Sequence, residues 1–174
     1  MAPDIDQLAQ AHGRAVFSAA YRVLGDTGLA EDVQQGVFVR LLEKPPRRQV
    51  DHWAAYLCSM ATRAAIDELR RRQRWRRLAE RFRVIADPTE PMPPDVHDQA
   101  TRASRLRRAL GCLPKRQAEC FALRFFHGQS IDDIARSLAV SPNVVSVALN
   151  RATHSLRRRV EALESTRSRK QEAQ

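Results

Sequence analysis

The feature that most constrains this fold is an abrupt change of residue types between Val84 and Ala100. This stretch has no lysine or arginine, and it combines prolines with acidic residues: Pro88, Pro91, Pro93, Pro94, Asp87, Glu90, Asp95 and Asp98. Prolines spaced this closely stop a helix and favour extended backbone. We therefore expect domains at 1–83 and 102–164, an extended linker at 84–101, and a frayed polar tail at 165–174.

Helical periodicity dominates on both sides of this break, so we expect an all-α fold of two small helical domains. Apolar residues recur at helical spacing over 16–24, 30–41 and 53–64, and the turn signals Gly25-Asp26 and Pro45-Pro46 separate these runs. Glycine occurs only 6 times, which argues against a sandwich or barrel with its frequent turns.

A block of nine arginines lies between residues 63 and 83. Trp75, Leu78, Phe82 and Ile85 keep a helical period through and beyond it. We expect a helix with an exposed basic face that is backed by a packed apolar stripe. Together with a net charge of +10, this block indicates a polyanionic partner.

The second domain contains the pattern of a helix-turn-helix. Ser130 is a candidate N-cap, and Ser141-Pro142 starts a new helix within three residues of the end of the previous one. The expected inner faces are Ile131, Ile134, Ala135 and Leu138 in the first helix, and Val145, Leu149, Ala152 and Leu156 in the second. The second helix of such a pair enters the DNA major groove.

Several classes of protein are disfavoured. The sequence has no phosphate-cradling glycine loop and no recognisable catalytic set, so we expect neither an enzyme nor a cofactor. Cys58, Cys112 and Cys120 lack metal-ligand spacing, so they are expected to be buried thiols and no metal site is expected. We expect no membrane insertion and a cytoplasmic location, because no uncharged run is long enough and Asp4 and Asp6 stand where an export signal carries positive charge.

From residue 8 to residue 163 the sequence resembles the extracytoplasmic-function sigma factors, which direct bacterial RNA polymerase to promoters. The segments that carry the resemblance are Tyr21-Arg22-Val23-Leu24-Gly25-Asp26, Ala30-Glu31-Asp32-Val33-Gln34-Gln35, Ile66-Asp67-Glu68-Leu69-Arg70-Arg71, Leu113-Pro114-Lys115-Arg116-Gln117 and Asp133-Ile134-Ala135. The resemblance implies three partners: core RNA polymerase through its beta-prime clamp and beta flap, promoter DNA, and an anti-sigma factor.

The resemblance also implies roles for individual residues. Those for polymerase binding are Glu31, Asp32, Gln35 and Arg40. Those for promoter melting and the minus-ten element are Trp53, Tyr56, Arg63, Arg70, Arg71 and Arg74. Those for the minus-thirty-five element are Arg124, Ser141, Asn143, Ser146, Val147, Asn150 and Arg151. Trp53 and Tyr56 fit either base stacking or core packing, and both alternatives stay open.

The sequence departs from the family pattern at several of these places. Gly36 replaces a usual acidic residue in the polymerase-binding helix, and Arg63 stands where an asparagine is common. Ser146 and Ala148 replace frequent basic residues, so the recognition helix is poor in positive charge.

Two residues of the recognition helix suggest a base preference. Asn150 can form paired hydrogen bonds with adenine, and Val147 can contact a thymine methyl group. We therefore expect a minus-thirty-five element richer in A·T pairs than is usual for the family.

Two further alternatives stay open. The acidic linker fits either threading through a basic channel of the polymerase or a spacer that stays off the basic helices. The rival function is a stand-alone helix-turn-helix regulator, which is normally a symmetric dimer on a palindromic site.

Overall fold

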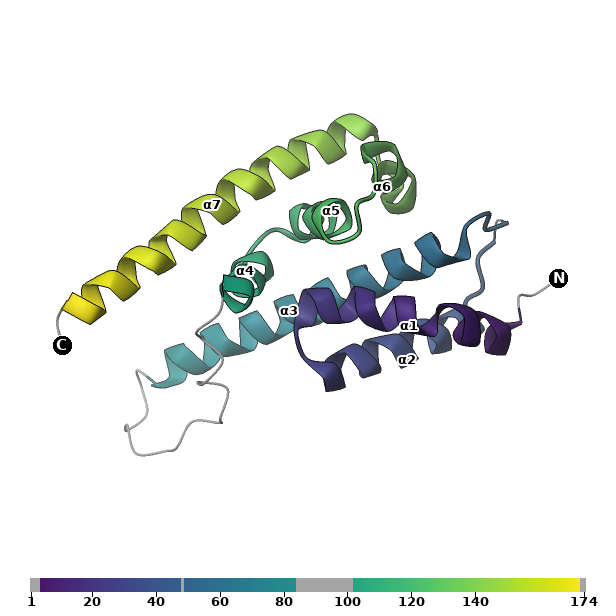
Figure 1. Ribbon diagram of the computed structural model, residues 1–174, viewed down its shortest axis with the longest axis horizontal. Helices are drawn as coiled ribbons and strands as arrows, with labels where there is room; N and C mark the ends of the chain where they lie inside the picture. Colours follow the sequence, from purple (N-terminus) through teal and green to yellow (C-terminus); the bar gives the residue numbers. More distant parts are fainter. Residues whose placement is uncertain (1–3, 48, 84–101, 173–174) are drawn as a thin grey trace.

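The computed structural model describes residues 4–47, 49–83 and 102–172. Within these residues all regular structure is helical, which confirms the all-α prediction; the predicted linker lies outside them. The helices are α1 (Ile5–Leu24), α2 (Thr27–Glu43), α3 (Trp53–Arg83), α4 (Arg102–Gly111), α5 (Lys115–Phe125), α6 (Ile131–Leu138) and α7 (Pro142–Glu172). Helix α3 packs against α1 and α2 on one side and against α4 and α5 on the other, and α7 packs on α4 and α5 (Figure 1).

The turn between α1 and α2 forms where the sequence predicts it. Gly25 adopts the left-handed conformation at φ 69°, and its N–H bonds to the Tyr21 carbonyl. Asp26 then caps α2 by accepting a hydrogen bond of 2.9 Å from the Leu29 N–H. This tight turn lays α1 and α2 side by side against the first half of α3.

The predicted helix-turn-helix is present as α6 and the start of α7. The Ser130 hydroxyl accepts a hydrogen bond from the Asp133 N–H at 3.1 Å, and the Ser141 hydroxyl accepts one from the Val144 N–H at 3.4 Å. The inner face of α6 and the start of α7 pack into one cluster with α5, which includes Cys120, Leu123, Ile134, Ala135, Leu138, Val145 and Ala148. The predicted inner residues Ala152 and Leu156 are buried in a different cluster.

Helix α7 is longer than the sequence predicts. It continues through Glu172, so the expectation of a frayed tail from residue 165 is wrong for 165–172. After Pro142 this helix contains no further proline and no glycine, so no residue in it breaks the helix.

The two halves of the chain share an apolar core. Residues of α1, α2 and α3 pack in one buried cluster with residues from the second half; its members include Ala20, Val23, Leu24, Ala65, Ile66, Leu110, Leu113, Ala122, Ala152 and Leu156. The sequence predicts two units but gives no sign that they pack together. Small domains have little interior of their own, so burying a shared apolar face stabilises both halves.

The expectation that the apolar stripe on α3 is packed is wrong. Trp75 is 64% exposed, Phe82 is 60% exposed and Leu78 is also exposed. The reason is that α4 contacts a different face of α3, where Gly111 lies against Leu69. Ile85, expected to continue the stripe, lies outside the described residues.

Candidate polymerase and promoter surfaces

Helix α2 presents an exposed polar face. Glu31, Asp32 and Gln35 are all exposed and lie within about 100° of one another around the helix axis, given about 100° per residue. Arg40 is exposed too, but the same rotation places it on the opposite side of the helix from Glu31. The structure therefore brings together three of the four predicted polymerase-binding residues.

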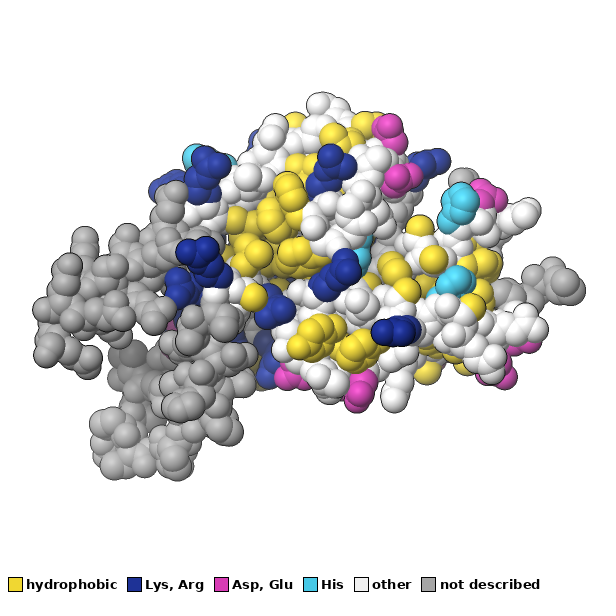
Figure 2. Space-filling model, in the orientation of Figure 1, with side chains coloured by type: hydrophobic (Ala, Val, Ile, Leu, Met, Phe, Trp, Pro, Cys, Tyr) yellow, Lys and Arg dark blue, Asp and Glu magenta, His cyan; other side chains and the backbone are white. Residues whose placement is uncertain are grey.

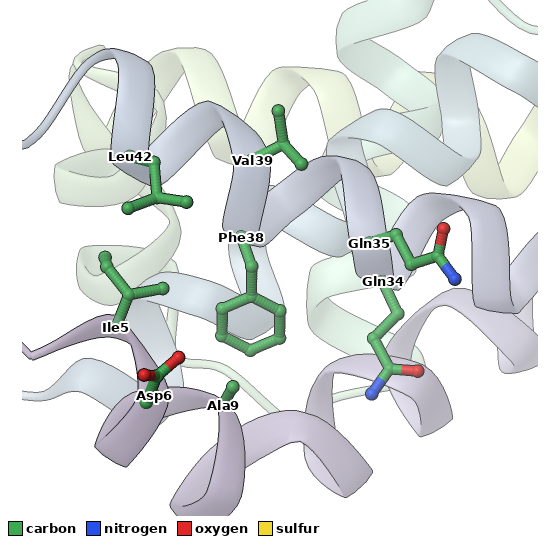
Figure 3. Close-up of a pocket in the computed structure, with 8 residues that line it drawn as sticks. All are labelled: Ile5, Asp6, Ala9, Gln34, Gln35, Phe38, Val39 and Leu42. Atoms are coloured by element: carbon green, nitrogen blue, oxygen red, sulfur yellow. The ribbon is translucent and has the colours of Figure 1, made fainter.

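An open groove between α1 and α2 adjoins this face (Figure 3). Ile5 and Ala9 contribute from α1 and Phe38 from α2, while Val39 and Leu42 stand at its edge, 52% and 64% exposed. Val39 and Leu42 are not among the residues predicted for polymerase binding. The sequence could have indicated that these two side chains are exposed, since other apolar residues already fill the inner face of the same helix.

Replacing Gly36 by alanine is expected to raise the free energy of unfolding by about 0.5–1 kcal/mol. Gly36 lies in the interior of α2, and an added Cβ would meet no atom within 4 Å. Chemical denaturation measures the change. Gly25→Ala is the contrasting control, because Gly25 has φ +69° and an added Cβ would lie 2.5 Å from the Arg107 guanidinium. A less stable Gly36→Ala protein would contradict this account of α2.

Trp53 and Tyr56 lie at the start of α3 and are both half-buried. Their rings meet edge to face with centroids 5.8 Å apart, and both pack against the cluster that contains Leu41 and Leu57. The core-packing alternative accounts for the buried part of each ring. Because part of each ring is exposed, stacking of these rings on DNA bases stays a prediction.

The four predicted minus-ten arginines have different surroundings. Arg74 is exposed, and Arg71 is held by Glu68 through hydrogen bonds of 2.9 and 3.0 Å. Arg63 and Arg70 instead reach the second half of the chain: Arg63 pairs with Glu119, and Arg70 donates to the Leu113 carbonyl. Two of the four arginines thus join the two halves, although the Arg63 side chain is still 47% exposed.

Glu119 of α5 is the acidic centre of that junction. Its side chain is 2% exposed and has three cations around it, at 3.6 Å from Arg63 Nε, 3.7 Å from Arg116 Nη1 and 3.9 Å from Lys115 Nζ. Glu119 Oε1 accepts no hydrogen bond from the described residues. A buried carboxylate in this setting depends on its cations for stability, so it attaches α5 to α3 through Arg63.

A second polar contact joins the halves at His127, which follows α5. The Thr62 hydroxyl donates to the Cys58 carbonyl at 2.8 Å, so His127 Nε2, at 2.8 Å from the same oxygen, acts as the donor. Burial, reinforced by the positive charge of Arg22, lowers the pKa of His127 to about 4. The imidazole is therefore neutral near pH 7.

The outer face of α7 is open to solvent. Asn143, Val147, Asn150 and Arg151 are exposed and share one side of the helix, while Ser146 is half-buried at its margin and donates to the Pro142 carbonyl at 3.1 Å. Arg124, at the end of α5, is exposed and donates to the Gln129 carbonyl at 2.9 Å. The predicted minus-thirty-five residues of α7 thus form one surface, with Ser141 at its N-cap.

Ala148 is buried, so it belongs to the core and not to the recognition face. The expectation of three buried thiols holds for Cys120, whose pKa burial raises to about 11, but Cys58 and Cys112 are half-buried. In the part of the chain that the structure describes, no group of three or more potential ligands is arranged to hold a metal ion, and no helix is both long and apolar enough to cross a bilayer.

Charge is unevenly distributed over the surface. On the face drawn in Figure 2, lysine and arginine side chains spread across both halves of the molecule, whereas acidic side chains lie near its margin. A surface of this sign attracts a polyanion over a distance set by the ionic strength.

Two family models match this chain in a defined order. Residues 8–75 match Sigma-70 region 2, and residues 103–153 match Sigma-70, region 4. The chain is also 29% identical over 158 residues to the ECF RNA polymerase sigma factor SigE of Mycolicibacterium smegmatis. The chain belongs to the extracytoplasmic-function sigma factors. The match with SigE covers 89% of this sigma factor but only 61% of SigE, less than two thirds of that relative.

Further comparisons agree with this assignment. This sigma factor is 25% identical over 145 residues to SigK of Mycobacterium tuberculosis, covering 82% of the chain and 78% of SigK. Its fold is similar to that of RpoE from Bartonella quintana, with a TM-score of 0.56, 18% identity and coverage of 90% and 96% of the two chains. It is also similar to that of SigJ from Mycobacterium tuberculosis, with a TM-score of 0.51, 19% identity and coverage of 88% and 53%.

Proposed function

We propose that this sigma factor binds core RNA polymerase and directs it to promoters by reading minus-ten and minus-thirty-five elements. One observation supports this above all: the arginine-bearing α3 and the open recognition face of α7 lie in one chain, in the order of sigma regions 2 and 4. Two unlike DNA-facing surfaces fit an asymmetric promoter that a single chain reads. A stand-alone regulator usually binds a palindrome as a symmetric dimer.

The division of labour follows the predicted domains. Residues 1–83 bind the beta-prime clamp through the exposed face of α2 and the adjacent groove, and they melt and read the minus-ten element through α3. Residues 102–164 bind the beta flap and read the minus-thirty-five element through α7, and residues 84–101 connect the two. The protein itself performs no catalysis, because RNA synthesis belongs to the polymerase.

An anti-sigma factor is the third proposed partner. RpoE of Bartonella quintana, whose fold this chain shares, was solved in a complex with the anti-sigma factor NepR. The proposed site of action is the bacterial cytoplasm, where polymerase and promoter DNA are found.

In vitro transcription tests this function directly. Purified core polymerase, fragmented genomic DNA and this protein are expected to yield defined start sites that core polymerase alone does not produce. The protein is expected to co-purify with the core enzyme. A protein that binds duplex DNA as a dimer but neither joins the polymerase nor changes its start sites would favour the stand-alone regulator instead.

A further inference from the structure

The exposed side of α7 has an uncharged centre. Asn143, Val147 and Asn150 are exposed and lie on successive turns, within about 60° of one another around the axis at about 100° per residue. The buried side chains of Val145 and Ala152 lie on the opposite side of the helix. The centre of the recognition face is therefore built from two carboxamides with a branched apolar side chain between them.

Arginines lie around this centre and not in it. Arg151 is exposed about 70° to one side of the centre, and Arg157 and Arg158 are exposed about two turns beyond Asn150. The N-terminal residues of a recognition helix contact base edges, whereas phosphate contacts fix its register and carry no sequence information. The positions of these arginines favour phosphate contacts, and the uncharged centre is left to face the bases.

The two carboxamides are available to DNA. Within the residues that the structure describes, no hydrogen bond or ion pair engages the side chain of Asn143 or Asn150. The hydroxyl of Ser146, between them in the sequence, already donates its one proton to the Pro142 carbonyl at 3.1 Å. The first turns of α7 therefore offer the bases two side chains that can each donate and accept a hydrogen bond.

The chemistry of these side chains selects A·T pairs. In the major groove adenine presents the N7 acceptor and the N6 donor, and a carboxamide matches both with its own donor and acceptor. Guanine presents two acceptors there, N7 and O6, so a carboxamide oxygen would face an acceptor. The methyl groups of Val147 can contact the C5-methyl group of thymine, which cytosine lacks.

The helix also sets the spacing of the two carboxamides. Asn143 and Asn150 are seven residues apart, about 20° short of two full turns, so both face the same way. At about 1.5 Å per residue they are separated by about 10.5 Å along the axis. This length corresponds to about three base pairs at about 3.4 Å per pair. Val147 lies between them, so its methyl groups meet a base pair between the two.

We propose that α7 reads two A·T pairs about three base pairs apart, whose adenines are bound by Asn143 and Asn150, with a thymine methyl group against Val147 between them. Arg151 binds phosphate in this arrangement. The preference expected from Asn150 and Val147 thus becomes a pattern with a defined spacing and a further reader, Asn143. That this pattern forms the minus-thirty-five element rests on the proposed function, whereas the base preference of α7 does not.

Selection from random duplex DNA tests this pattern in two arms. One arm uses the full chain with core polymerase and a promoter, found by the transcription assay, whose minus-thirty-five region is randomised. The other arm uses the full chain alone, because the outer face of α7 is open to solvent. Sequencing of the bound DNA is expected to show A·T pairs enriched at least about fivefold over G·C pairs at two positions about three base pairs apart.

Exchange of one carboxamide for arginine separates base contact from a structural role. Asn150→Arg is expected to change the preference at one of the two positions from A·T to G·C by about tenfold, because arginine binds O6 and N7 of guanine. Asn143→Arg is expected to change the other position. Thr153→Arg is the matched control. Thr153 is exposed about 90° from the centre of the face, so this variant is expected to bind all sequences more tightly with the preference unchanged.

Each outcome decides a separate point. Selected DNA that shows G·C pairs or no base preference in both arms would overturn the pattern, and so would an Asn150→Arg protein that selects the same DNA as the wild type. If start sites are defined but the selected element is rich in G·C pairs, the proposed function stands and the pattern fails. If the chain alone selects the two A·T pairs but neither joins the polymerase nor changes its start sites, the pattern stands and the proposed function fails.

Discussion

A chain carrying both Asn150→Ala and Arg151→Ala is expected to initiate about 10- to 100-fold less transcription from a promoter that depends on its minus-thirty-five element. Both side chains are exposed on the outer face of α7, and neither packs in the core. A bidentate contact to a base is worth about 1–3 kcal/mol of discrimination. Run-off transcription with a saturating amount of core polymerase measures the loss, and binding to core polymerase is expected to be unchanged.

Two single variants give this prediction its controls. Ser146→Ala is expected to leave transcription within about twofold, because its hydroxyl already donates to the Pro142 carbonyl of its own helix. Arg157 is exposed further along α7 and is a candidate phosphate contact. Arg157→Gln is therefore expected to weaken binding on all sequences alike and to reduce the salt slope by about 1. A double variant that still distinguishes the wild-type minus-thirty-five element from a scrambled one would show that α7 does not read bases through these residues.

The local structure was largely predictable because single residues determine it. Gly25 supplies the left-handed turn after α1, and Asp26 caps α2. Ser130 and Ser141 cap the helices of the helix-turn-helix, and Pro142 occupies the first position of α7. These effects act over about four residues, so they can be identified in the sequence without knowledge of the tertiary fold.

The junction between the halves was not predictable in the same way. Glu119 and His127 stand in no recognisable motif, and each acquires its surroundings from residues more than 50 positions away, such as Arg63 and Thr62. The same limit explains the error over Trp75. Helical periodicity identifies an apolar stripe correctly, but it does not say whether another element covers that stripe.

The candidate site was predictable to a different degree on each surface. On α7 the helical period of apolar residues predicted the outer face, of which Ser146 is half-buried, while Ala148, noted as a frequently basic position in the family, lies in the core. On α2 the family resemblance included Arg40, which turns away from Glu31, and it passed over the exposed Val39 and Leu42. Resemblance transfers positions, whereas the rotation of the helix decides which positions share a face.

Acidification from pH 6.5 towards pH 4 is expected to lower the free energy of unfolding through His127 by about 2 kcal/mol, with allowance for screening by water at a partly open site. Burial and Arg22 lower its pKa from 6.5 to about 4. Arg22 approaches from α1 and donates to the Phe126 carbonyl, while α3 presents the hydroxyl of Thr62 and the thiol of Cys58, whose pKa burial raises.

The direction follows from proton binding. Between pH 6.5 and pH 4 the unfolded chain carries a proton on His127 that the folded chain does not, so stability increases with pH across this window. The contribution is complete above pH 6.5 and is lost as the pH falls towards 4. Denaturation curves at a series of pH values measure it.

His127→Gln separates this effect from the titration of carboxylates. Glutamine does not titrate, and its amide can still donate to the Thr62 hydroxyl, so the variant is expected to lack the His127 part of the pH dependence. Asp133, whose pKa is lowered by hydrogen bonds from Ser130 and Arg136, titrates in both proteins and cancels in the difference. If wild type and His127→Gln lose stability in parallel from pH 6.5 to 4, then His127 is not held neutral between the halves. The contact with Thr62 would then not help to hold the two halves together, and their junction would rest on its other contacts, such as Arg63 with Glu119 and the shared apolar core.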